Sequence, residues 1–401
     1  MIQAAIEKFS ELAQATTEFS PPYENLYRLC EKQGQFTEAI NALNKAIEIH
    51  PRYQPHQGAL QQLYLKLYNE KMKAGQRKAA TKLVHTAIKN FNEIADRAPG
   101  LATPYEQLSV FCEKRGRLKE AIETLGKAIE IHPDYKPHKF RLAKLHVARA
   151  KRHDANSRKE LGQSSMEVAI GIYTKLAEDN PEQAAAHERL SEIYEWQERY
   201  TDAIAAKKKA IEIHPDYQPH QIRLVALTVA FAKKYNNSKE YAEAVEILTG
   251  TIDFLDKFSP DHERLVRLLD MASEFQEHLG QFDKALQLLE RASRIWPHEH
   301  FLTERIGILL EKSKRIESAE ATFLRLLENN QDSASVIEIV ARFYQRQAMP
   351  LKSETIVKEA MRRGVNFGKD RDWLAKFKAT QTTSSSTNID DLNTHSKPNA
   401  K

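Results

Sequence analysis

The histidines of this chain are the residues whose type and spacing most suggest metal chemistry. They recur as pairs six residues apart with a tyrosine inside each pair, and Asp134 and Asp216 add a carboxylate to two of them; the pairs are His50/His56, His132/His138 and His214/His220. A structural zinc site needs about four ligands, and no thiolate or further ligand closes a tetrahedron here. A proline turn also keeps the two histidines off one helical face. We therefore predict no metal and no cofactor, and interpret each pair as part of a connector whose second proline starts the next helix, at Pro55, Pro137 and Pro219.

Catalytic motifs are missing from the sequence. It contains no glycine-rich phosphate loop, no G-x-S-x-G, no H-E-x-x-H and no C-x-x-C. No strand-rich block is present that would hold such a motif. The sequence therefore predicts a protein without enzymatic activity.

Pairs of carboxylates form the clearest candidate binding surface. Their members are seven residues apart, about two helical turns, so each pair lies on one helical face. The pairs are Glu24/Glu31, Glu106/Glu113, Glu188/Glu195 and Asp270/Glu277, and a separate basic cluster comprises Arg141, Lys144, Arg149, Lys151 and Arg152. Two interpretations stay open. Either the acidic and basic faces neutralise each other or stay solvated, or they line a groove that takes a segment of a partner protein.

These residues belong to a long internal repeat. The segment KAIEIHP ends at Pro51, Pro133 and Pro215, a weaker copy ends at Pro297, and the sequence positions of these prolines rise in equal steps of 82. A fixed period of this kind predicts a repeat architecture. In the first copy Ala39, Ile40, Leu43, Ala46 and Ile47 have the spacing of one helical face, Tyr23, Leu26, Tyr27 and Cys30 mark an earlier helix, and Gly34 supplies the turn between the two.

This pattern resembles the tetratricopeptide repeat family. The packing residues that the family uses occur in order, as Tyr23, Leu26, Gly34, Ala39, Leu43, Ala46 and Pro51 in the first copy, Tyr105, Leu108, Gly116, Ala121, Leu125, Ala128 and Pro133 in the second, His187, Leu190, Tyr194, Ala203, Ala210 and Pro215 in the third, and Leu269, Ala272, Gly280, Ala285, Leu289, Ala292 and Pro297 in the fourth. The third copy departs from the pattern, with Lys207 at a bulky position and Glu198 at the turn glycine. The resemblance implies an all-α fold, a right-handed α-solenoid of antiparallel helix hairpins whose concave surface carries the carboxylate pairs.

The period also predicts how the chain is divided. An ordinary repeat of this family has about 34 residues, so a period of 82 corresponds to one ordinary and one extended hairpin. Within a solenoid over 20–378 we predict ordinary hairpins near 20–51, 102–133, 184–215 and 266–297, extended hairpins between them, and plain repeats over 300–365. A last helix is expected over Phe367 to Lys378, where Trp373, Leu374 and Phe377 close the core, and the tail 379–401 lacks the apolar content to fold.

Residues 1–19 align with the second helix of an extended hairpin. Ala5, Ile6, Phe9, Leu12 and Ala13 take the places of Ala87, Ile88, Phe91, Ile94 and Ala95. This predicts a helix without its partner, with an apolar edge where solenoids usually carry a polar cap. Either the helix is a makeshift cap, or the chain is the downstream part of a longer repeat protein, or the edge binds something.

Composition narrows the functional classes. The formal net charge of +5 over 401 residues predicts no general attraction to nucleic acid or anionic lipid. The sequence contains no apolar run of about 18 residues, so we predict no membrane insertion. Glu7 and Glu11 interrupt the apolar core that a signal peptide would need, which indicates a cytoplasmic protein. Cys30 and Cys112 lie one period apart, too far for a disulfide, and are expected to be small core residues.

The function predicted from the sequence is that of a non-catalytic scaffold or adaptor. It would bind a protein or peptide segment through the concave surface of the solenoid, while the oligomeric state stays open. One alternative is an accessory or separated repeat region of a glycosyl- or sulfotransferase. The other is an RNA-binding solenoid whose basic residues track phosphates, which the acidic pairs and the lack of aromatic platforms beside the basic residues disfavour.

Overall fold

Every secondary-structure element in the described part of the chain is an α-helix. The computed structural model describes residues 2–367 except 239 and 261, and contacts within the chain divide it into two compact units, Met1–His214 and Pro215–Lys401. The first unit comprises α1 (Ile2–Ala15), α2 (Ser20–Lys32), α3 (Phe36–Ile49), α4 (Gln54–Lys73), α5 (Arg77–Arg97), α6 (Thr103–Lys114), α7 (Leu118–Ile131), α8 (Lys136–Ala155), α9 (Lys159–Glu178), α10 (Ala184–Trp196) and α11 (Tyr200–Ile213). The second comprises α12 (Gln218–Ser238), α13 (Tyr241–Asp256), α14 (Glu263–His278), α15 (Phe282–Ile295), α16 (His300–Lys312), α17 (Ile316–Glu328), α18 (Ala334–Arg346) and α19 (Pro350–Arg362).

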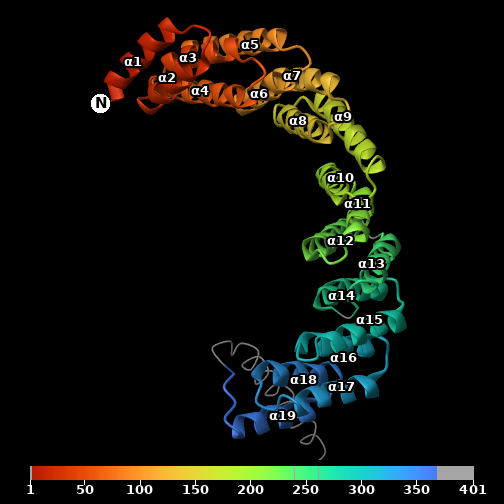
Figure 1. Cartoon of the computed structure of the whole chain (residues 1–401). Coiled ribbons are helices and arrows are strands. Elements are labelled where there is room, and N and C mark those ends of the chain that lie inside the picture. Colours follow the sequence, from red (N-terminus) through yellow and green to blue (C-terminus); the bar gives the residue numbers. More distant parts are fainter. Residues whose placement is uncertain (1, 239, 261, 368–401) are drawn as a thin grey trace, which may run out of the picture. The chain divides into compact units, whose positions relative to one another are not determined.

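Helices that follow one another in the sequence pack together as hairpins within each unit (Figure 1). Examples are α2 with α3 and α8 with α9 in the first unit, and α14 with α15 in the second. This confirms the predicted fold class, an all-α solenoid of helix hairpins. Among the described residues, no helix is both long enough and apolar enough to cross a membrane.

Helix boundaries recur with regular spacing. The helices α3, α7, α11 and α15 begin at Phe36, Leu118, Tyr200 and Phe282, and each start follows the previous one by the same period of 82. Later in the chain, α16 and α18 begin at His300 and Ala334, a spacing of 34. These intervals support a repeat unit of one short and one long hairpin, followed by plain repeats, which we keep as a proposal.

The core consists of the apolar helical faces that the spacing predicts. Ala39, Leu43 and Ala46 are fully buried, and the same cluster includes the rings of Tyr64 and Phe111. Proline occupies the first turn of α4 and of α8, as predicted for the connectors, because the missing N–H would have no helical partner there. Both cysteines are free and buried, which confirms their predicted core role.

The turn between two paired helices keeps a left-handed backbone conformation even where another residue replaces glycine. Gly34 and Gly116 have φ of +75° and +72°, and Glu198 keeps the same conformation with φ of +57°. Ala348, which follows α18, has φ of +54°. For a residue with a Cβ this conformation costs roughly 1–2 kcal/mol.

Replacing Ala348 by glycine is therefore expected to raise the free energy of unfolding by about 1 kcal/mol, because glycine adopts this conformation without a steric penalty. The matched control is Gly34→Ala, which should lower the free energy of unfolding by a similar amount. Its added Cβ would meet nothing within 4 Å, so any loss reflects the backbone alone. Urea denaturation followed by circular dichroism measures both changes, and equal midpoints for A348G and the wild type would contradict the prediction.

The ends of the predicted solenoid are only partly described. At the N-terminus α1 packs against α2, and Leu12 is 46% exposed, whereas Ile94 at the equivalent place in α5 is 2% exposed. The role of α1 as a cap stays a prediction. The last helix predicted after Phe367, with Trp373, Leu374 and Phe377, and the tail 379–401 lie outside the described residues.

Candidate functional site

The first carboxylate of each predicted pair meets a connector histidine in the first two copies. Glu106 Oε1 lies 2.6 Å from His138 Nε2, and Glu24 Oε1 lies 3.4 Å from His56 Nε2. Both imidazoles are buried and contact the tyrosine that precedes them, at 4.5 Å between ring centroids. Burial lowers the pKa of His56, and the nearby Glu24 carboxylate opposes that shift. In the first unit, these contacts tie the connector to the preceding hairpin.

The second carboxylate of the pair meets a basic residue of the next hairpin. Glu31 pairs with Lys66 at 2.6 Å, and Glu113 pairs with Arg141 at 3.0 Å. In the second unit Glu277 pairs with Lys312, and the first carboxylate of that pair, Asp270, also has a basic partner, Arg305, at 2.6 Å. A further ion pair of the same kind joins Glu311 to Arg346 at 2.9 Å. Most predicted acidic contact residues therefore already have a partner within the chain, and their role in partner binding stays a prediction.

Glu188 and Glu195 complete the predicted set and lie half-buried on α10. Their positions follow the same spacing as the other pairs. A role of these two carboxylates in partner binding likewise stays a prediction.

The residues of the predicted basic cluster lie on α8 and have different surroundings, and their role in partner binding stays a prediction. Arg141 turns to Glu113, Arg149 donates to Ser165 Oγ at 3.0 Å, and Arg152 donates to the carbonyl of Gly116. Lys151 is exposed on α8. Lys144 lines a pocket, which the sequence did not predict.

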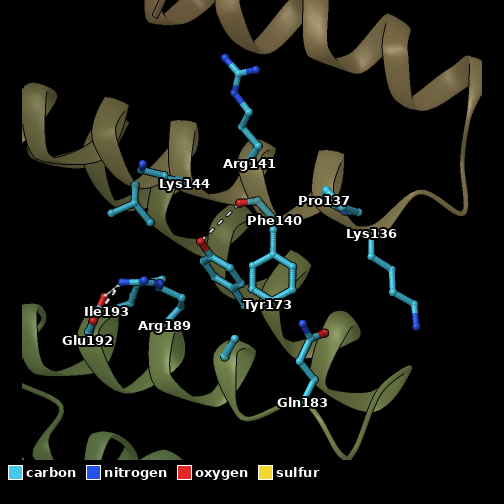
Figure 2. Close-up of a pocket in the computed structure, with 12 residues that line it drawn as sticks. Lys136, Pro137, Phe140, Arg141, Lys144, Tyr173, Gln183, Arg189, Glu192 and Ile193 are labelled. Carbon is cyan, nitrogen blue, oxygen red and sulfur yellow. Dashed lines mark hydrogen bonds and ion pairs between the residues drawn. The ribbon is translucent and has the colours of Figure 1, made fainter. Parts of the chain in front are cut away.

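This pocket has a volume of about 820 Å³ and lies between α8, α9 and α10 of the first unit. Its lining residues are Lys136, Pro137, Phe140, Arg141, Lys144 and Val147 of α8, Tyr173 of α9, and Gln183, Ala185, Arg189, Glu192 and Ile193 in or before α10. Figure 2 shows Phe140 and Tyr173 side by side at its centre, with Arg141 pointing away from both rings. The floor is apolar and the rim is basic.

The floor of the pocket is held rigidly. The rings of Phe140 and Tyr173 meet edge to face, with centroids 5.6 Å apart, and the Tyr173 hydroxyl donates to the carbonyl of Phe140 at 3.4 Å. Burial raises the pKa of Tyr173 to about 12, so its hydroxyl stays protonated as a donor at neutral pH. Tyr173 and Ile193 are almost completely buried.

Weaker helix packing accompanies the pocket. One period earlier, α4 packs directly against α6, and the rings of Tyr64 and Phe111 lie 6.0 Å apart between them. His146 and Ile193 take the places of those two rings in the next copy. The smaller side chains fill less space, and α8 and α10, which are both fully described, make no comparable contact.

The described histidines, cysteines and carboxylates do not gather into a metal site, and the thiol of Cys112 is unreactive. No group of three or more His, Cys, Asp or Glu side chains within them could hold a metal ion. The Cys112 thiol is fully buried, and burial raises its pKa to about 12, which leaves almost no reactive thiolate at neutral pH.

Comparison with known families gives one consistent result. Two models described as tetratricopeptide repeat match the chain, one over residues 155–217 and the other over residues 23–53 and 102–135. No curated protein matches it.

Three solved structures that resemble this chain are YrrB, the P58(IPK) TPR domain and MamA, and the first two are described as TPR proteins. One is YrrB, described as a TPR protein with an unusual peptide-binding site, at 18% identity over 54% of this chain and 96% of that one, with a TM-score of 0.30. The P58(IPK) TPR domain has 16% identity over 91% of this chain and 99% of that one, with a TM-score of 0.27. MamA has 11% identity over 45% of this chain and 90% of that one, with a TM-score of 0.31.

Proposed function

We propose that this chain, which is a tetratricopeptide repeat protein, acts as a non-catalytic adaptor that holds a segment of a partner protein in the pocket between α8, α9 and α10. The observation that carries the proposal is the pocket itself, a hollow of about 820 Å³ at a junction where, in the preceding copy, the equivalent helices α4 and α6 pack directly together. Pockets that bind ligands typically have volumes of about 300–1,000 Å³.

The lining of the pocket suits a protein segment. An apolar floor gains free energy when a partner side chain displaces water, and a charged rim sets orientation and encounter rate. Phe140, Val147 and Ile193 supply the floor, and Lys144 and Arg189 stand at its edge. This proposal narrows the binding surface predicted from the sequence to one junction. The ion pairs that the acidic residues make with basic residues of the next hairpin then serve mainly to hold one hairpin against the next.

Ala185→Trp is expected to abolish capture of the partner. Ala185 lines the pocket and is half-buried at the start of α10, so an indole at this position would occupy the hollow without removing any core side chain. The control is Ala205→Trp, at an exposed alanine of α11 that does not line the pocket.

The two variants are compared with the wild type in nuclease-treated pull-downs read by mass spectrometry. Proteins retained by the wild type and by A205W but lost from A185W would support the proposal, provided that circular dichroism shows intact helices. An identical set of proteins on A185W and the wild type would rule out the pocket as the binding site. A co-purifying transferase that A185W also retains would favour the enzyme-linked alternative.

A further inference from the structure

We infer that the α8–α10 pocket selects an acidic protein segment that carries a bulky apolar side chain, and this inference rests on the proposed function. The apolar side chain would enter the hollow over Phe140 and Tyr173. The carboxylates of the segment would meet the basic rim.

The charge of the lining is unbalanced. Four basic side chains, Lys136, Arg141, Lys144 and Arg189, stand against one carboxylate, Glu192. Arg189 donates to both oxygens of Glu192 at 3.0 and 2.8 Å, so this carboxylate is already engaged. A ligand with negative charge would therefore complement the pocket.

Two of the four basic side chains keep their charge available. Arg141 is paired with Glu113 outside the pocket, and Arg189 is paired with Glu192. Lys136 donates to the neutral amide of Asn180, and exposed Lys144 has no ion pair within the described residues. A ligand carboxylate could reach Lys144 without breaking a contact that the chain already makes.

Three of the four basic side chains of the rim occur only in this copy of the repeat, whereas Arg141 has Ala59 before it and Arg223 after it at the equivalent places. At the equivalent places one period before and one period after, Lys144 is replaced by Gln62 and Ala226, Lys136 by Gln54 and Gln218, and Arg189 by Gln107 and Met271. A rim that served only the general stacking of hairpins would not need lysine at one junction alone. The copy with the open pocket is also the copy with the basic rim.

The size of the hollow points to a ring or a branched aliphatic side chain as anchor. In the preceding copy the place of Ile193 is taken by the larger Phe111, which is completely buried and lies 6.0 Å from the ring of Tyr64. An incoming Phe, Tyr, Trp or Leu side chain would contact the apolar lining residues Phe140, Val147 and Ile193. Aromatic anchors in such pockets often dominate binding energy.

Single-stranded nucleic acid would also bring negative charge and rings, but the pocket suits it less. Base stacking needs an aromatic face that is open to solvent. Tyr173 is 2% exposed, so the half-buried Phe140 is the only ring of the lining that could offer a face to a base, whereas an apolar side chain can also contact Val147 and Ile193. We therefore assign the site to a protein segment and make RNA an outcome of the test.

The test selects ligands from a phage-displayed library of random dodecapeptides on the full chain. Selected peptides are expected to combine an aromatic or large aliphatic residue with at least two aspartates or glutamates. The strongest peptide is then synthesised with a fluorescent label and titrated by anisotropy against the wild type, A185W, Lys144→Glu and Lys151→Glu. Lys151 is an exposed lysine of the same helix that does not line the pocket, so K151E is the matched charge control.

We expect K144E to weaken binding about tenfold or more, K151E to weaken it less than about threefold, and A185W to abolish it. Selected peptides that need the open pocket but carry no acidic bias would overturn this inference and leave the proposed function standing. Peptides that bind A185W as well as the wild type would overturn both. Direct binding of fluorescently labelled polyuridylate RNA to the wild type, lost in A185W, would instead assign the pocket to nucleic acid.

Discussion

Replacing Gly307 by alanine is expected to lower the free energy of unfolding by about 1–3 kcal/mol, the usual cost of overpacking a filled core. Gly307 is buried within α16, and a Cβ there would lie 2.7 Å from both Cε atoms of Phe323. Phe323 cannot turn away easily, because it is completely buried and its ring centroid lies 4.7 Å from that of Phe343. The gain in helix propensity from glycine to alanine, about 1 kcal/mol, offsets only part of this cost.

The next plain repeat supplies a rescue for this variant. Ala341 and Val357 take the places of Gly307 and Phe323 in that repeat, and both are buried in one cluster. A larger residue on one helix is thus matched by a smaller one on the other. We therefore expect G307A combined with Phe323→Val to be more stable than the sum of the two single changes predicts.

A control separates overpacking from the general effect of alanine. Gly171 lies exposed in the interior of α9, and a Cβ there would meet nothing within 4 Å. Gly171→Ala should therefore stabilise the chain by about 1 kcal/mol. Urea denaturation followed by circular dichroism compares all four variants. A destabilised G171A, or additive effects in the double variant, would contradict the proposed cause.

Helix faces and turns could be predicted from the sequence because they depend on residues close together in the chain. The spacing of Ala39, Leu43 and Ala46 indicates one buried face whatever that face packs against. Glu198 shows the limit of a local rule. The turn consensus asks for glycine, yet the turn forms with φ of +57° at this glutamate, because packing of α10 against α11 fixes the backbone.

The sequence predicts the acidic pairs as a surface, but it does not identify the basic residues that lie opposite them in the fold. The signal was present, since Lys66, Lys312 and Arg346 each stand 35 residues after the carboxylate that they pair with. Arg141 stands only 28 residues after Glu113, so this ion pair does not follow the same spacing. Interhelix pairs of this kind need the positions of two helices in space, and apolar periodicity within one helix does not give them.

The pocket could not be predicted from the repeat pattern, because the pattern does not show how closely neighbouring helices pack. Comparing copies would reveal that His146 and Ile193 replace two rings, but a smaller side chain does not by itself open a hollow. Neighbouring helices often move together to fill such a space. Whether α8 closed onto α10 therefore depended on the whole junction, including the edge-to-face packing of Phe140 on Tyr173.

Acid is expected to weaken the first unit through His146. This imidazole is buried in α8, and burial together with the nearby Arg149 lowers its pKa from 6.5 to about 4. Arg149 donates to its Nδ1 across 3.3 Å, and a guanidinium can only donate, so the ring must offer a lone pair and stay neutral. Protonation would remove that hydrogen bond and place two cations together.

The sign of the effect follows from the order of protonation. As the pH falls below about 6.5, the unfolded chain binds a proton at His146 while the folded chain does not, so stability is present above that pH and is lost as the pH falls toward 4. Between pH 7 and 4.5 this single group should remove about 2 kcal/mol of stability.

Native-state hydrogen exchange over α8 and α9 measures this loss locally, which matters because repeat proteins open in parts rather than all at once. His146→Leu should remove about 2 kcal/mol of the pH dependence that the wild type shows in these helices. His85→Leu removes an exposed histidine of α5 and serves as the matched control. If H146L and the wild type lose stability in parallel from pH 7 to 4.5, the imidazole is charged in the folded state, and the contact with Arg149 cannot be a hydrogen bond to a ring lone pair.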